Sequence, residues 1–152
     1  MDKYMADESG RSMVELIGVL SVMGMITAGA FALIHSGQAS RRISRADDDV
    51  SNIAMNIRAL MAESDDFSNL PGASDLDKGT KLLDAMSLTT TTPFGSSTTY
   101  SVTQNSKDSN GFIVLLNGLS DQDCMTLAQR AWAGSVANAS CDGGVLAVFF
   151  AA

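Results

Sequence analysis

A run of 19 residues without a charge, from Leu16 to Ile34, constrains the fold of this chain more than any other feature. Its length is close to what a helix needs to cross the hydrocarbon core of a bilayer. One carboxylate, that of Glu15, stands directly before the run. A charge at the edge of hydrocarbon is costly and is usually retained for a function. The sequence therefore predicts an apolar helix that lies in lipid or against other helices, with a functional acid at its entrance.

The residues before the run form a short motif. In Gly10-Arg11-Ser12-Met13-Val14-Glu15, a glycine that closes a polar leader precedes the glutamate by five positions. This arrangement resembles the class III signal of type IV pilins and the related pseudopilins. The resemblance implies that a prepilin peptidase cuts between Gly10 and Arg11, that the new terminal amine is methylated, and that Glu15 serves in filament assembly. Arg11 stands where the family usually has phenylalanine or methionine.

The position of the cleavage glycine distinguishes this chain from one with an ordinary secretory signal. Such a signal is cut after an apolar run of about 7–15 residues. Here the glycine comes before the run, so the apolar helix would stay in the mature protein. Lys3 and Arg11 precede the run, and Arg41, Arg42 and Arg45 follow it, so the charges do not decide its orientation. An N-terminus in the cytoplasm is therefore implied by the resemblance.

Beyond the apolar run, an amphipathic pattern continues the helix. Apolar residues recur at helical spacing, and no proline occurs before Pro71. The apolar stripe comprises Ile43, Val50, Ile53, Ile57, Leu60 and Met61, and the opposite face carries Asp47, Asp48, Asp49 and Asn52. The pattern predicts a helix from Ser12 to about Glu63, with a second half that lies on a domain and aspartates that are solvated and balanced by arginine.

The rest of the chain predicts a small α+β head. The expected strands are Thr98–Val102, Phe112–Leu116 and Val145–Phe150, of which the last two are apolar enough to be central. The expected helices run from a cap at Ser74 to Met86 and from a capping box at Ser120 to about Ala133. Residues 89–97 are rich in turn-forming residues and predict an exposed segment.

A long helix packed on a small antiparallel sheet is also the fold that the pilin resemblance implies. Pro93-Phe94-Gly95 and Gly118-Leu119-Ser120 resemble segments of the type IVb branch. The expected organisation has four parts: a leader of residues 1–10, a transmembrane or filament-core helix of residues 11–40, an amphipathic half-helix of residues 41–64, and a head of residues 65–152.

Two cysteines, Cys124 and Cys141, lie in the head. If the head lies outside the cytoplasm, the even count predicts one disulfide that closes a loop of about 17 residues. The alternative is a pair of buried free thiols. A tetrahedral metal site is disfavoured, because two cysteines and the single His35 cannot complete it. We therefore expect no metal and no cofactor.

Glu15 also has a simpler interpretation, in which Ser12 and Glu15 form a capping box at the start of a helix. The resemblance implies a further role, in which Glu15 of one subunit neutralises the terminal amine of a neighbour; the two interpretations are compatible. Gly18, Gly24 and Ala28 are small residues that permit close helix approach, although glycine is common in membrane helices.

The remaining motifs favour structural over chemical roles. His35 has no acidic or cysteine partner nearby in sequence, and Asp142-Gly143-Gly144 favours a turn over a calcium site. Asn138-Ala139-Ser140 matches a glycosylation sequon, a frequent chance occurrence. Residues 46–152 carry 13 acidic and 5 basic side chains, so nucleic acid is not expected as a partner. No enzyme motif is present.

The sequence thus predicts a structural subunit of a type IV pilus. Its partners would be identical or related pilin subunits, a prepilin peptidase and an inner-membrane assembly platform. It would cross the inner membrane once before assembly and lie in an extracellular pilus afterwards. The alternatives are a pseudopilin of a type II secretion system, in a periplasmic pseudopilus, and a single-pass membrane-anchored binding or sensor domain. A small enzyme that uses His35 is a further, weaker alternative.

Overall fold

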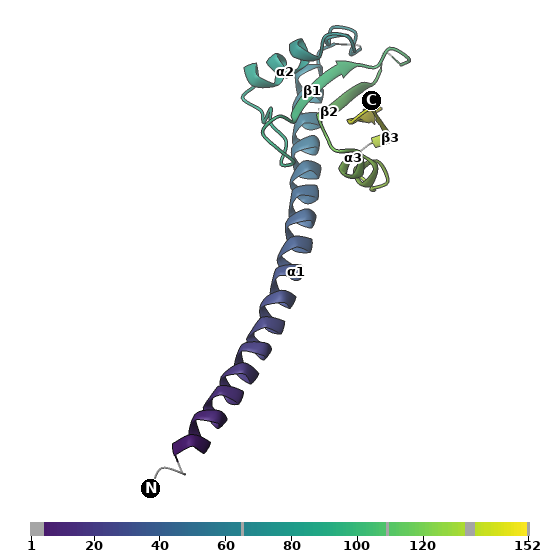
Figure 1. Cartoon of the computed structure of the whole chain (residues 1–152). Coiled ribbons are helices and arrows are strands. Elements are labelled where there is room, and N and C mark those ends of the chain that lie inside the picture. The colour runs from purple at the N-terminus through teal and green to yellow at the C-terminus, as the bar shows by residue number, and fades with distance from the viewer. Residues whose placement is uncertain (1–4, 65, 109, 133–135, 152) are drawn as a thin grey trace. The chain divides into compact units, whose positions relative to one another are not determined.

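The computed structural model describes residues 5–64, 66–108, 110–132 and 136–151, with side chains from Met13 onward apart from His35 and Ser36. The elements in chain order are α1 (Met5–Leu60), α2 (Leu76–Ala85), β1 (Thr99–Gln104), β2 (Phe112–Asn117), α3 (Asp121–Ala128), β3 (Val136–Asp142) and β4 (Val145–Phe150) (Figure 1). Contacts divide the chain into two compact units, residues 1–41 and 42–152. The fold is α+β, with a long N-terminal helix and a small antiparallel sheet, as the sequence predicts.

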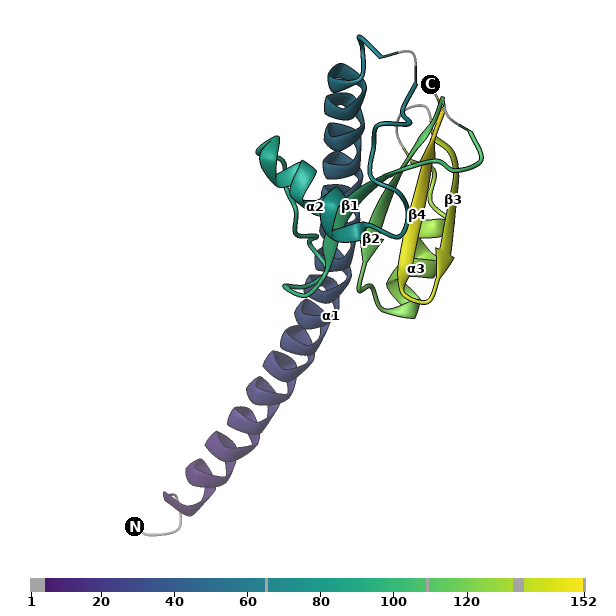
Figure 2. The same ribbon diagram turned by 90° about the horizontal axis from the view of Figure 1, so that it is seen from above.

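The sheet belongs to the second unit and has the strand order β1-β2-β4-β3, with every neighbouring pair antiparallel. The central strands β2 and β4 face each other in register, from Phe112 opposite Phe150 to Leu116 opposite Leu146 (Figure 2). Their sequences are nearly all apolar, and the strand order confirms the prediction that they are central. The strand at Val145–Phe150 has the predicted bounds, and β2 ends one residue later than predicted. Strand β1 begins one residue later and ends two residues later than predicted.

The part of α1 within the second unit supplies one wall of the core. Val50, Ile53 and Ile57 are at most 1% exposed and pack in a single apolar cluster with the inner face of the sheet. Of the other residues in the predicted stripe, Ile43 and Met61 are partly buried and pack against this cluster, whereas Leu60, the last residue of α1, is 49% exposed. Ala46 and Ala54 are also buried. Their small side chains let the helix backbone lie close to the domain, which a search for large apolar residues does not detect.

Helix α2 lies against β1. Its N-cap is Asp75, without a side-chain cap bond, and not Ser74 as predicted. A Cβ added at Gly79 would lie 2.3 Å from the carbonyl oxygen of Val102, so only glycine permits this close approach. The Ser101 hydroxyl donates to the Leu76 carbonyl at 2.8 Å. The edge strand β1 is therefore covered by a helix, which protects it from pairing with another chain.

In the C-terminal part, one helix is shorter than predicted and one strand has no counterpart in the prediction. Helix α3 ends at Ala128, not near Ala133. The Trp132 indole then lies beyond the helix and donates to the Leu127 carbonyl at 3.0 Å, which satisfies an end-of-helix acceptor. Strand β3 was not predicted, because its sequence alternates weakly and contains no large apolar residue beyond Val136. It forms as an edge strand through its pairing with β4.

The segment of residues 89–97 is only partly exposed, in contrast to the prediction. Thr92 is 6% exposed, and its hydroxyl forms a hydrogen bond with that of the equally buried Thr98. Thr91 pairs with Thr99 through an isolated β-bridge. The segment therefore continues the sheet edge beside β1, and the Thr92 hydroxyl is hydrogen-bonded within the fold.

Arg58, in the last turn of α1, fixes the end of β4. Its guanidinium carbon lies 5.8 Å from the ring centroid of Phe112 and 5.6 Å from that of Phe150. One guanidinium nitrogen donates to the Ala151 carbonyl at 3.1 Å. A cation over two aromatic rings with a simultaneous hydrogen bond holds the helix, the strand and the chain end together.

Arg58→Met is therefore expected to lower the free energy of unfolding by about 1–2 kcal/mol, because the cation–π contacts and the bond to Ala151 are lost. Urea unfolding of the detergent-solubilised chain measures this, with the fluorescence of the single tryptophan, Trp132, as the signal. Lys81→Met removes a positive charge from an exposed position of α2 and serves as the control. Equal effects of the two substitutions would contradict the role given to Arg58.

Candidate functional site

The first unit presents a continuous apolar surface. Every side chain from Met13 to Ile34 is exposed, and the large apolar ones range from 53% exposure at Val19 to 78% at Met25. By length and composition, α1 can cross a membrane. A soluble protein rarely exposes an apolar patch of this extent. This segment therefore requires lipid or other helices around it, and the chain has the properties of a single-pass membrane-anchored protein.

Two hydroxyls within the apolar run are satisfied by the helix itself. The Ser21 hydroxyl donates to the Ile17 carbonyl at 2.8 Å, and that of Thr27 donates to the Met23 carbonyl. In hydrocarbon a polar group without a partner is costly, and hydrogen bonds within one helix avoid this cost. Ser21 and Thr27 are thus compatible with a lipid environment.

Glu15 lies on the surface of α1 beside Leu16, Val19 and Leu20, all of them exposed. The helix begins at Met5, so Ser12 lies inside it and is not an N-cap in the uncut chain. The capping-box interpretation of Ser12 and Glu15 is therefore wrong for this form of the chain. Glu15 then stands as a carboxylate at the entrance of the apolar run without a capping role.

The other residues predicted for processing and packing lie on the same helix. Gly10 and Arg11 fall in its first turns, but their side-chain environment lies outside the described residues, as does that of His35. A Cβ at Gly18 or Gly24 would meet nothing within 4 Å, and Ala28 is exposed. The single chain brings no partner to these small residues, so their role in helix packing stays a prediction.

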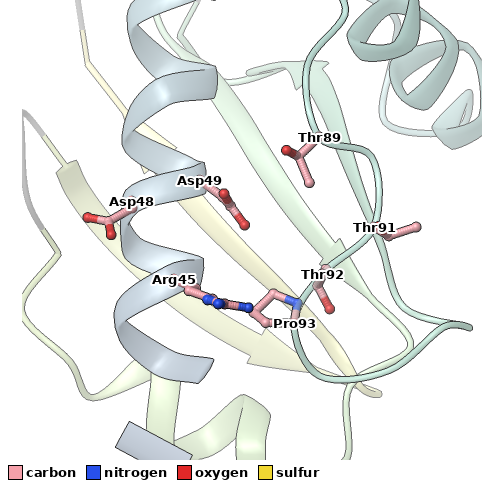
Figure 3. A pocket seen from close by; sticks show the side chains of 7 residues that line it. All are labelled: Arg45, Asp48, Asp49, Thr89, Thr91, Thr92 and Pro93. Atoms are coloured by element: carbon pink, nitrogen blue, oxygen red, sulfur yellow. The ribbon is translucent and has the colours of Figure 1, made fainter. Parts of the chain in front are cut away.

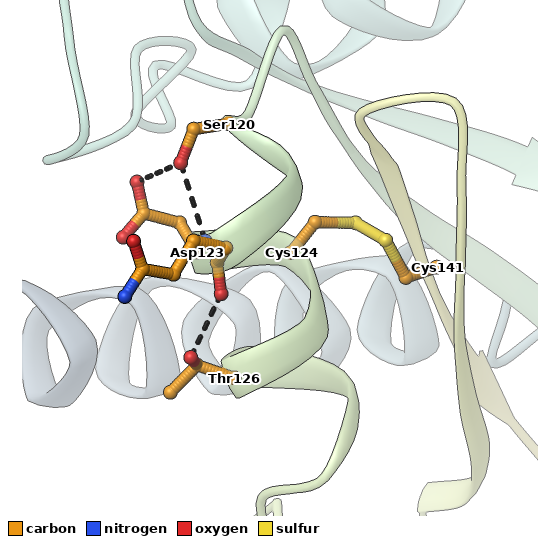
Figure 4. The surroundings of a disulfide bond; sticks show 6 residues. Ser120, Asp123, Cys124, Thr126 and Cys141 are labelled. Atoms are coloured by element: carbon orange, nitrogen blue, oxygen red, sulfur yellow. Dashed lines mark hydrogen bonds between the residues drawn. A yellow bond between two sulfur atoms is a disulfide. The ribbon is translucent and has the colours of Figure 1, made fainter.

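The second unit contains the disulfide that the cysteine count predicts. Cys124 and Cys141 are bonded, with their Cα atoms 5.7 Å apart (Figure 4). The bond joins α3 to the edge strand β3. Ser120 caps α3, as predicted, and its hydroxyl accepts from the Asp123 amide at 3.2 Å. The β3–β4 turn follows at Gly143 and Gly144, whose φ angles of 55° and 77° favour glycine.

The aspartates of α1 are not the purely solvated face that the sequence predicts. Asp47 forms an ion pair with Arg130 at 3.6 Å. The Asp49 carboxylate accepts a hydrogen bond of 3.1 Å from the hydroxyl of the buried Tyr100. Asp49 points into a hollow of about 440 Å³ between α1 and the threonine-rich segment, and Arg45 and Asp48 also line this hollow (Figure 3). Tyr100 and Asp49 are 51 residues apart, so no local pattern relates them.

Burial shifts the titration of this pair. It raises the pKa of Asp49, and the Tyr100 hydroxyl opposes that shift. Burial and the adjacent carboxylate raise the pKa of Tyr100 well above 10. The phenol therefore remains a donor at every pH at which the protein would be handled. The pair holds α1 to β1 and orients the Asp49 carboxylate at the hollow.

The raised pKa of Asp49 predicts a pH dependence. A carboxyl group with a higher pKa in the folded state stabilises the fold below its ordinary pKa of 3.8, and this contribution is lost as the pH rises through the raised value. Asp49→Asn keeps an acceptor for Tyr100 but removes the titration. Its stability relative to the parent chain should be lower at pH 3 than at pH 7, as measured by urea unfolding. A pH-independent difference would contradict the assignment, and Asp84→Asn, at an exposed position of α2, serves as the control.

Among the described residues, no group of three or more histidine, cysteine, aspartate or glutamate side chains is placed to hold a metal ion. Comparison with protein-family models, with curated proteins and with solved structures found no match. The candidate functional site is therefore defined by this chain's own residues, above all by Glu15 and the exposed apolar run that follows it.

Proposed function

We propose that this chain is a prepilin, cut after Gly10 and polymerised as a structural subunit of a type IV pilus. One observation carries the proposal: a glycine lies five positions before the single carboxylate that enters an exposed 19-residue apolar run. The run needs lipid before assembly and neighbouring helices after it. A filament core built from such helices supplies the second environment. The function is structural, and no catalytic step is part of it.

The disulfide supports the expected orientation. Disulfides persist in oxidising compartments and are rare in the cytoplasm. The head that carries Cys124–Cys141 then lies outside the cytoplasm, and the segment before the apolar run lies inside. In this orientation Gly10 is on the side from which the chain is inserted, at the membrane surface where an intramembrane or interfacial peptidase acts.

Cleavage after Gly10 would place a new amine four residues before Glu15. Those residues span about 6 Å of helix axis. An amine of one subunit can then reach Glu15 of a neighbour when the two helices are staggered by roughly one turn. Both charges would be costly alone in an apolar core, so their pairing selects that stagger. Glu15 would thus fix the axial register of the filament.

Intact-mass and N-terminal analysis of the membrane-extracted protein tests the proposal. Co-expression with a prepilin peptidase should yield a chain that begins at Arg11, with one methyl group on its amine. Gly10→Glu should prevent the cut, while Gly18→Ala, which alters a glycine within the run, should leave it unchanged. If the wild-type chain stays uncut in the presence of an active peptidase, the prepilin assignment is wrong. The alternative of a membrane-anchored binding or sensor domain would then be favoured.

A further inference from the structure

A groove lies on α1 where the apolar run ends. It is lined by Leu33, Ile34, Gly37, Gln38 and Arg41 and has a volume of about 370 Å³. All five residues are exposed, and a Cβ at Gly37 would meet nothing within 4 Å. The absence of a side chain at Gly37 therefore forms a notch between an apolar rim and a polar rim.

Helical spacing gives the groove its direction. Leu33, Gly37 and Arg41 recur every four residues and share one face of α1. Along about 12 Å of helix axis, this face changes from an aliphatic side chain, through a bare backbone, to a guanidinium. Arg41 forms no ion pair with any other residue that the structure describes. One end of the groove is thus suited to hydrocarbon and the other to an anion.

The length of the apolar run places the groove at the edge of a bilayer. Leu16–Ile34 spans about 28 Å, close to the roughly 30 Å of hydrocarbon in a typical membrane. Gly37 and Arg41 then follow within about 5–10 Å, at the level of the lipid headgroups. The aliphatic stem of an arginine can bend so that its charge reaches the phosphates.

We propose that this groove binds an anionic phospholipid. One acyl chain lies along Leu33 and Ile34, the glycerol region occupies the notch at Gly37, and the phosphate contacts Arg41 with Gln38 beside it. The charge of the guanidinium selects an anionic lipid over a zwitterionic one. The inference rests on the membrane insertion contained in the proposed function, but not on cleavage or polymerisation. The bound lipid would set the depth of the unassembled subunit.

Native mass spectrometry of the full-length chain, released from nanodiscs of equimolar phosphatidylglycerol and phosphatidylcholine, tests the proposal. The wild-type chain should retain phosphatidylglycerol in preference to phosphatidylcholine. Arg41→Gln should lower this preference about fivefold, the effect of one cationic side chain at an anionic membrane surface. Gly37→Leu keeps every charge, and the helix is retained because leucine is favourable in a helix. Since the leucine side chain fills the notch, this variant should also lower the preference for phosphatidylglycerol.

Arg42→Gln is the matched control, because it makes the same charge change about 100° around the helix, outside the groove. It should leave most of the preference intact. Equal losses of lipid preference in Arg41→Gln and Arg42→Gln would contradict lipid binding in the groove. An unchanged preference in Gly37→Leu would contradict it as well. Flotation with phosphatidylcholine vesicles separates the two proposals: insertion without lipid preference removes only this inference, whereas failure to insert removes the proposed function as well.

Discussion

Glu15→Ala is expected to leave cleavage after Gly10 intact and to abolish incorporation of the chain into filaments. The proposed cut lies five residues before the substitution, and the apolar run is unchanged. In the assembled core, however, the amine of a neighbouring subunit would lose its partner. An uncompensated buried charge costs roughly 3–5 kcal/mol, so the contact should weaken by more than a hundredfold. Because each subunit would carry this cost, no filament should form.

The measurement is the amount of subunit in sheared filaments relative to the mature subunit in the membrane. Glu63→Ala is the matched control, since it removes the same charge from an exposed position just after α1. It should assemble normally. Filaments of normal yield from Glu15→Ala would refute the pairing role. A loss of cleavage in that variant would instead assign Glu15 to recognition by the peptidase.

The elements that the sequence predicts well are those with a strong local pattern. The apolar run, the stripe of Val50, Ile53 and Ile57, and the nearly all-apolar β2 and β4 each define their structure by composition and spacing. The capping box at Ser120 is likewise local. For the candidate site, the same applies to Glu15 and the exposed helix that follows it, because an uncharged apolar run of this length can form few structures other than a membrane-spanning or packed helix.

The features that the sequence does not reveal depend on contacts between distant segments. Strand β3 carries Asn138 and Ser140 and forms because β4 offers a free edge. The Asp49–Tyr100 hydrogen bond joins residues far apart in the chain. It shows that part of the helix face predicted to be solvated lies against the domain. The notch at Gly37 has no signal of its own, since glycine is common in such helices. Gly37 forms part of a groove only because Leu33 and Arg41 lie on the same face of the helix.

Removal of the disulfide is expected to have the largest effect on the stability of the head. Cys124–Cys141 closes a loop of 17 residues, and a constraint of this length contributes roughly 3 kcal/mol. The loop contains the second half of α3 and most of β3, and β3 pairs only with β4 in the described sheet. Cys124→Ala with Cys141→Ala should therefore lower the melting temperature by roughly 10–20 °C. Trp132, which lies within the closed loop, reports the transition by fluorescence.

Reduction of the wild-type chain provides the control, because it breaks the bond without replacing either cysteine by a smaller residue. It should produce nearly the same loss as the double substitution, whereas reductant should not affect the double variant. Hydrogen exchange should become faster first at the amides of β3, since an edge strand tied by one ladder opens most readily once its covalent link to α3 is gone. An unchanged melting temperature on reduction would mean that the pairing of β3 with β4 alone holds the C-terminal part. The disulfide would then have no part in stabilising the head against unfolding.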